Sequence, residues 1–302
     1  MDDLVFHTLD VFSDRAYSGN PLAVVTGADG LSVAQMQAIA REFNLSETIF
    51  VQAPRDPAHT ARVRIFFPTA EIPFAGHPTI GCAILLSGLL NDGADGRADL
   101  VLEEQAGLVP VRVSRARDSV TAEFTAPVLP FAATGGTPAG EVAQALGLAP
   151  RDIGCTGHGA PAHWQGGPSY LFVPVADPDA LARACPVGPH WSRVMAAWGA
   201  DGAWLYTHDG AAGYRARMFS PTAGIPEDPA TGSAAAIFAA ELLSAGRLRA
   251  GETRLDIIQG VEMGRLSRIG LRIEVQDGAL SAVHVRGAAV PVSSGRIRPP
   301  GA

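Results

Sequence analysis

The sequence predicts a mixed α/β protein of two similar domains, each a mostly antiparallel, barrel-like sheet around a central apolar helix. Three observations support this prediction: a phrase that occurs twice, many short segments of strand character, and two helix-length segments that are apolar on all sides. The phrase is FPTAEIPFAGHPTIGCA at 67–83 and SPTAGIPEDPATGSAAA at 220–236. Pro78 and Pro229 hold the same place in the two copies, half of the 302-residue chain apart, which indicates a duplication.

The first half of the sequence is rich in strand patterns. Alternating or apolar runs at 3–12 and 22–26 predict two strands joined by the turn-rich segment YSGNP. Ser32 is placed to cap a helix whose apolar residues recur at helical spacing as far as Phe43. A strand is expected to begin at Glu47, and further strands are expected at 62–67, 100–104, 108–113 and 120–124.

The second half repeats this plan after a linker. Residues 126–140 hold three prolines and three glycines, which is typical of a linker. A helix is predicted near 191–198, and strands are predicted at 170–175, 203–207, 213–219, 254–259, 266–275 and 282–292. The expected domains are 1–127, completed by the returning C-terminal strand within 282–302, and 128–281, with an active site in the cleft between them.

The two central helices, which end the two copies of the phrase, suggest a binding function. Because they are apolar nearly all round, each must be wrapped by a sheet. Proline favours the first helical position, which predicts His77 and Asp228 as N-cap residues. Gly81 and Gly232 each cost a helix about 1 kcal/mol relative to alanine, so a packed chain segment or a ligand should approach there. Helix N-termini bind carboxylates and phosphates, and two of them facing one cleft would hold a small anionic substrate.

Composition excludes several classes of function. The net charge is −7 and no basic run occurs, so no nucleic-acid partner is expected. Three scattered cysteines cannot form a disulfide framework, which favours a cytoplasmic location. The start MDDLVFHTLDVF is not a signal peptide, and the longest apolar stretches are shorter than the ~20 residues of a membrane span. The eight histidines show no ligand spacing, so no metal site is expected.

Four ordered motifs, SGNPLAVV, LSETIFV, PFAGHPTIG and EDPATGSAA, resemble the PhzF-type phenazine biosynthesis family. QGVEMGR at 259–265 extends the resemblance over nearly the whole chain. That family belongs to the diaminopimelate epimerase and proline racemase superfamily. The resemblance implies a diaminopimelate epimerase-like fold, a cofactor-free isomerase and, by analogy, a homodimer. The best-known member, trans-2,3-dihydro-3-hydroxyanthranilate isomerase, moves a proton within its substrate ring.

The resemblance also implies roles for individual residues. The glutamate of S-E-T, the acid/base group of the family, matches Glu47, and three further site residues match His77, Asp228 and Ser233. The sequence itself adds that Glu47 stands between a polar loop and an apolar strand, where desolvation suits general acid/base work. The second half has Gly202 at the equivalent point, so only one half supplies this carboxyl group.

Three further residues are candidates for substrate binding. The backbone N–H groups of Gly76 and Gly232 are expected to meet a substrate carboxylate, and Asn20 of the G-N-P turn is a candidate side-chain contact.

Two alternatives to the proton-shifting isomerase stay open. One is an epimerase or racemase with two non-thiol bases, Glu47 and either His77 or Asp228. The cysteine pair of the superfamily is missing here, because Cys82 lies inside its helix with Ser233 as its repeat partner. The other is a non-catalytic small-molecule-binding protein on the same scaffold.

Overall fold

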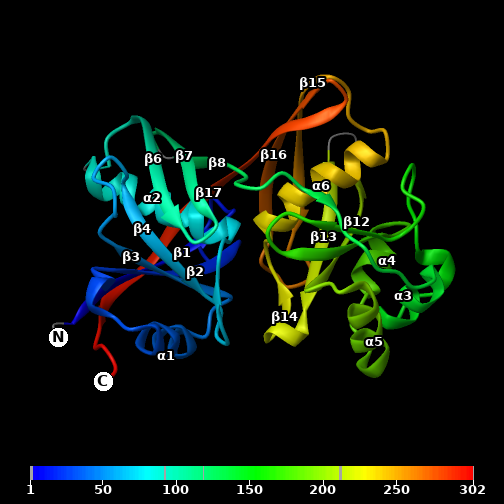
Figure 1. The fold of residues 1–302 in the computed structure, drawn as a ribbon, viewed down its shortest axis with the longest axis horizontal. Coiled ribbons are helices and arrows are strands. Elements are labelled where there is room, and N and C mark those ends of the chain that lie inside the picture. The colour runs from blue at the N-terminus through cyan, green and yellow to red at the C-terminus, as the bar shows by residue number, and fades with distance from the viewer. Residues whose placement is uncertain (1–2, 92, 118, 211–212, 302) are drawn as a thin grey trace. The chain divides into compact units, whose positions relative to one another are not determined.

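The computed structural model describes residues 3–91, 93–117, 119–210 and 213–301 and shows a mixed α/β chain (Figure 1). It divides into two compact units. Unit 1 comprises Met1–Pro127, Arg265–Arg268 and His284–Ala302, and unit 2 comprises Val128–Gly264 and Ile269–Val283. These units confirm the predicted fold class, a pseudo-repeated sheet around a central apolar helix.

Unit 1 is a closed eight-stranded barrel. In order of pairing, its strands are β1 (Leu4–Val11), β2 (Asn20–Thr26), β3 (Glu47–Gln52), β4 (Ala61–Phe66), β6 (Gly96–Glu104), β7 (Gly107–Ala116), β8 (Ser119–Thr125) and the later part of β17 (Ala279–Ile297). β17 pairs with β1 and closes the ring, so the barrel has no unpaired edge. The β2–β3 and β4–β6 pairs are parallel, and the other six are antiparallel.

The helix α2 (Gly76–Leu90) lies against six strands of this barrel, and Figure 1 shows it among them. Every residue from Gly76 to Ile84 is buried, as the apolar pattern predicts. A Cβ atom on Gly81 would lie 2.5 Å from Leu22 Cδ2 and 2.8 Å from Val11 Cγ2. Of the two explanations for this glycine, close packing against the barrel strands is therefore the one that the structure shows.

The helix α1 (Val33–Phe43) packs on the outside of unit 1 and leads into β3. Ser32 accepts a hydrogen bond from the Gln35 backbone N–H and Gln35 bonds back to Ser32, which makes a capping box. Asn44 ends the helix with a φ of 50°. The apolar face of α1 joins a cluster that includes Met36, Phe50 and Phe66. This packing fixes the point at which the chain enters β3, and thus the place of Glu47. The remaining short elements of unit 1 are η1 (Ala28–Gly30) and β5 (Glu71–Ile72).

Unit 2 repeats the strand pairing of unit 1. Its paired strands are, in order, β10 (Ala162–Gln165), β11 (Ser169–Pro174), β12 (Gly202–Asp209), β13 (Gly213–Ser220) and β15 (Gly251–Gln259). The successive pairs are antiparallel, parallel, antiparallel and parallel. The same order holds for β1, β2, β3, β4 and β6 of unit 1. Glu47 lies opposite Leu22, and Gly202 lies opposite Tyr170 in the equivalent ladder. The predicted equivalence of Glu47 and Gly202 is thereby confirmed.

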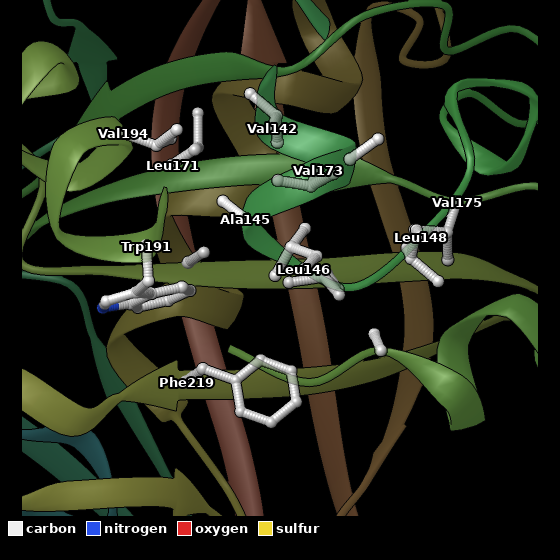
Figure 2. Packing of buried hydrophobic residues seen from close by; sticks show 14 of the residues in the cluster. Val142, Ala145, Leu146, Leu148, Leu171, Val173, Val175, Trp191, Val194 and Phe219 are labelled. Atoms are coloured by element: carbon white, nitrogen blue, oxygen red, sulfur yellow. The ribbon is translucent and has the colours of Figure 1, made fainter. Parts of the chain in front are cut away.

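The helix α6 (Gly232–Ser244) is the central helix of unit 2, and its residues from Gly232 to Leu242 are all buried. Three helices, α3 (Ala139–Ala145), α4 (Pro178–Arg183) and α5 (Gly188–Trp198), pack on the other face of the sheet. Figure 2 shows Trp191 of α5 and Leu146, the residue that follows α3, against Leu171, Val173 and Phe219 of the strands. The other elements are β9 (Phe131–Ala132), η2 (Pro150–Asp152), η3 (Pro221–Ala223), β14 (Ile225–Asp228) and β16 (Ser267–Gln276).

Both predicted N-caps are wrong. α2 begins at Gly76 with Ala75 as its N-cap, so His77 already lies in the first turn. α6 begins at Gly232 with Thr231 as its N-cap. Asp228 instead closes β14, where it pairs with Met218 of β13, and this strand pairing delays the start of the helix. No helix in the described part of the chain is long and apolar enough to span a membrane.

Candidate active site

In unit 1, three predicted site residues lie at the beginnings of neighbouring elements. Asn20 is the first residue of β2, Glu47 is the first residue of β3, and His77 is the second residue of α2. β2 and β3 are parallel, so their first residues share one end of the barrel. The exposed fractions are 0% for Asn20, 7% for Glu47 and 2% for His77, which places three polar side chains in a nearly dry setting.

The His77 ring joins the other two side chains. Its Nδ1 atom lies 3.2 Å from Asn20 Nδ2 and 3.4 Å from Glu47 Oε2. Burial lowers the pKa of His77 to about 3, against the opposing effect of a hydrogen bond to the Pro21 backbone. The ring is therefore neutral near pH 7, and Glu47 faces a neutral imidazole rather than a cation.

The two nitrogen atoms of the His77 ring have different surroundings. Nδ1 is the atom that faces both Asn20 and Glu47. Nε2 is buried and has no hydrogen-bond partner among the residues that the structure describes.

In unit 2, Asp228 belongs to a hydrogen-bond network before α6. The Thr231 hydroxyl donates to Asp228 Oδ2 over 2.6 Å. The Gln259 amide donates to the Asp228 carbonyl over 2.8 Å and to Thr231 Oγ1 over 3.0 Å. Its oxygen accepts from the Thr231 N–H and from the Trp204 ring. With all four hydrogen bonds made at 0% exposure, Gln259 holds the loop that carries Asp228 in one conformation.

Ser233 is the second residue of α6 and is 7% exposed. Its Oγ atom lies 3.4 Å from the hydroxyl of Tyr170. Tyr170 stands opposite Gly202 in its ladder, as Leu22 stands opposite Glu47. Ser233 thus contacts a hydroxyl group from the strand position that corresponds to Leu22 of unit 1.

The predicted site residues form two groups. The structure brings one group together at the start of α2 in unit 1: Asn20, Glu47, Gly76 and His77. It brings the other together at the start of α6 in unit 2: Asp228, Gly232 and Ser233. In each group the first N–H groups of a buried helix adjoin polar side chains, an arrangement suited to an anion. The cleft shared by the two groups stays a prediction.

Sequence reasoning missed three residues that support these groups, namely Thr231, Gln259 and Glu104. Gln259 is the first residue of the QGVEMGR motif, so this motif was the available signal. Glu104 carries no such signal, because only the strand register shows that its position in unit 1 corresponds to that of Gln259 in unit 2.

None of the three cysteines has the setting of a reactive thiol. Cys82 is buried within α2, and burial raises the pKa of its thiol. Burial likewise raises the pKa of Cys155 to about 11, and Cys185 is exposed. Among the described residues, no three His, Cys, Asp or Glu side chains converge as they would around a metal ion.

Comparison with known proteins agrees with this architecture. The family model described as phenazine biosynthesis-like protein matches residues 9–295. An uncharacterized isomerase of Mesorhizobium japonicum is 42% identical over 296 residues, or 95% of this chain and 96% of that protein. The trans-2,3-dihydro-3-hydroxyanthranilate isomerase of Pseudomonas chlororaphis is 37% identical over 295 residues, or 96% of this chain and 97% of that protein.

Among solved structures, a phenazine biosynthesis protein of the PhzF family from Bacillus anthracis matches with a TM-score of 0.84 at 24% identity. The match covers 99% of this chain and 100% of that one, so the two folds agree throughout. The resemblance seen in the four motifs is confirmed, and the chain belongs to the phenazine biosynthesis-like, or PhzF, family and is an isomerase.

Proposed function

We propose that this isomerase moves a proton on a small carboxylate-bearing substrate, without a cofactor, by general acid/base catalysis with Glu47. The observation that carries the proposal is that the Glu47 side chain is buried beside the neutral ring of His77. His77 belongs to the first turn of the central helix α2. The named activity of the Pseudomonas chlororaphis relative supports trans-2,3-dihydro-3-hydroxyanthranilate, or a close analogue, as the substrate.

In the proposed reaction, the residues at the start of α2 and those at the start of α6 have different roles. Glu47 takes a proton from an activated carbon of the substrate and delivers it to another carbon, so no proton is gained or lost overall. His77 and Asp228 bind polar groups of the substrate and orient its conjugated system. The substrate carboxylate binds the N–H groups at Gly76 and Gly232. The proposal therefore requires both groups to contact one substrate molecule, as the duplication predicts.

The contribution expected from Glu47 can be stated as a rate. One positioned acid/base group contributes about 10²–10⁴-fold. Orientation of the substrate and exclusion of water supply the remainder. The low exposure of Asn20, Glu47 and His77 suits such a water-poor site.

The experiment follows deuterium uptake from heavy water into trans-2,3-dihydro-3-hydroxyanthranilate. We expect Glu47→Gln to slow both uptake and turnover by about 10²-fold or more, because glutamine cannot carry the proton. Glu42→Gln, the same change at an exposed position of α1, serves as the matched control and should behave as the wild type. A Glu47→Gln enzyme that incorporates deuterium at the wild-type rate would refute the role of Glu47.

The epimerase alternative predicts inversion at one carbon by two bases. Glu47 Oε2 and His77 Nδ1 are only 3.4 Å apart, so they cannot stand on opposite faces of a carbon atom. That alternative is left with Asp228 as the second base. Chiral chromatography of the product distinguishes the two reactions, because an epimerase gives the mirror configuration with no double-bond shift.

A further inference from the structure

A second buried carboxyl group lies at the start of α2, outside the group that contains Glu47. Glu104 is the last residue of β6 and is 9% exposed. Its Oε1 atom lies 2.7 Å from the hydroxyl oxygen of Thr79, in the first turn of α2. Its Oε2 atom is buried and has no hydrogen-bond partner in the described part of the chain. A charged carboxylate with so few partners would be costly to bury.

The contacts of the Thr79 hydroxyl group bear on the protonation state of Glu104. Its oxygen lies 2.7 Å from Glu104 Oε1 and also 2.7 Å from the backbone carbonyl oxygen of Ala75. A threonine hydroxyl has one proton to donate, and the Ala75 carbonyl can only accept. If Thr79 donates to Ala75, the short contact with Glu104 is a hydrogen bond only when Glu104 carries a proton and donates it.

Strand register shows that unit 2 has an amide at the equivalent position. Glu103 lies opposite Arg62 in the β4–β6 ladder, and Ile258 lies opposite Arg215 in the β13–β15 ladder. Arg62 and Arg215 each stand four residues before the phenylalanine that pairs with the start of β3 or of β12. The residues that follow Glu103 and Ile258, Glu104 and Gln259, are therefore counterparts.

The two counterparts make the same kind of contact. Gln259 donates from its NH₂ group to the hydroxyl of Thr231, at the start of α6. Glu104 meets the hydroxyl of Thr79, at the start of α2. A protonated carboxyl group has the shape of an amide and offers one donor and one acceptor, whereas a carboxylate offers only acceptors. Only the protonated form of Glu104 can donate a hydrogen bond to a threonine hydroxyl, as Gln259 does.

The charged and titratable neighbours agree with this protonation state. Burial raises the pKa of Glu104 to about 8 and outweighs the lowering effect of the contact with Thr79. From α2, the Cys82 thiol faces Glu104 and is neutral, because burial raises its pKa. The His77 ring, in the same first turn, is neutral too. On the strands, Arg62 lies opposite Glu103 rather than Glu104, and Glu103 points to the other face of β6, where it pairs with His59.

We propose that Glu104 is a neutral carboxylic acid that positions the first turn of α2, and through it His77, as Gln259 positions the loop before α6. Its effect on the reaction rests on the proposed role of His77 in binding substrate. Its protonation state does not depend on that role. Loss of the proton leaves the Ala75 carbonyl and the carboxylate competing for the single Thr79 proton, which loosens the turn.

The protonation state is tested first, without any activity measurement. The group keeps its proton in the folded protein up to about pH 8 but ionises near 4.5 when unfolded. Because the folded state binds more protons in this window, its stability falls as the pH rises from about 4.5 to about 8. We expect thermal unfolding at pH 6.5, followed by calorimetry in buffers of different ionisation enthalpy, to release about one proton more from the wild type than from Glu104→Gln. Equal release from the two proteins would overturn the proposal.

The positioning role is tested by the dependence of kcat/KM on pH. We expect the wild-type value to fall above about pH 8, and Glu104→Gln to keep its neutral-pH value through this range because an amide cannot ionise. Glu104→Leu removes the donor and should lower kcat/KM at every pH. A Glu104→Gln variant that resembles Glu104→Leu, or that falls above pH 8 as the wild type does, would contradict the positioning role. Failure of the Glu47 deuterium experiment would instead leave the proton release unchanged, so the two proposals fail separately.

Discussion

The packing of α2 inside the barrel can be tested by adding a single methyl group. In Gly81→Ala, the new Cβ atom would lie 2.5 Å from Leu22 Cδ2 and 2.8 Å from Val11 Cγ2, well inside van der Waals contact. Both neighbours are completely buried, and they come from β1 and β2, which pair with each other in a closed barrel. The two side chains therefore have little room to move outward.

Two opposing effects decide the size of the change. Alanine is the better helix former by about 1 kcal/mol. Forcing an extra methyl group into a packed core costs about 1–3 kcal/mol. Since both contacts are with fully buried side chains, we expect the packing cost to exceed the helix gain, and Gly81→Ala to lower the free energy of unfolding by about 1 kcal/mol.

Gly88 provides a matched control in the same helix. A Cβ atom there would lie 3.4 Å from Arg115 Nη2, the flexible end of a long side chain that can shift at little cost. Gly88→Ala should therefore keep most of the helix gain and raise the free energy of unfolding by about 0.5–1 kcal/mol. The two variants should differ by about 2 kcal/mol in opposite directions.

Urea unfolding followed by circular dichroism measures this difference. A change in midpoint at constant m-value reports a change in stability, and fluorescence should be recorded in parallel to show whether the two units unfold together. If Gly81→Ala stabilises the protein as much as Gly88→Ala does, then no barrel side chain packs against Gly81. The glycine would then need another explanation, such as close approach of a ligand.

Two further predictions concern the polar groups. Thr231→Val removes the donor to Asp228 Oδ2 and an acceptor of the Gln259 amide, so it should lower kcat/KM about tenfold and the free energy of unfolding by about 1–3 kcal/mol. Thr231→Ser keeps the hydroxyl group and should show wild-type values of both. Identical kinetics for the two variants would contradict the role of this network. Hydrogen bonds from the backbone and from His59 lower the pKa of Glu103 to about 2, so its stabilising effect is present above pH 4.5 and is lost as the pH falls toward 2. Thermal midpoints of Glu103→Gln should therefore vary less than those of the wild type between pH 5 and pH 2, and parallel curves would refute this.

Local signals predicted the parts of the fold that depend on neighbouring residues. The Ser32 cap could be predicted from the sequence because the capping box spans only four residues. The burial of α2 could be predicted because no side of this helix is polar. The equivalence of Glu47 and Gly202 followed from the duplication, and the ladders confirm it. In each case the information lies within one element or in the repeat.

The first residues of the central helices α2 and α6 could not be predicted from local signals. The proline rule placed His77 and Asp228 at the N-caps, yet Asp228 is held in β14 by pairing with Met218. That partner is ten residues away on another strand, and no local preference of the EDPATG segment reveals it. Backbone pairing between strands therefore outweighed the local preference of proline.

By itself, the sequence determined that this chain is a duplicated α/β protein, which two helices are buried, and that only one half carries a carboxyl group at the start of its third strand. These properties follow from periodicity and repetition, which are local or self-similar. The tertiary structure alone decided that His77 is neutral, that Gln259 holds Asp228, and that Glu104 takes the place of an amide. The physical reason is that hydrogen-bond partners and desolvation come from strands distant in sequence, and only closure of the sheet around the helix brings them together.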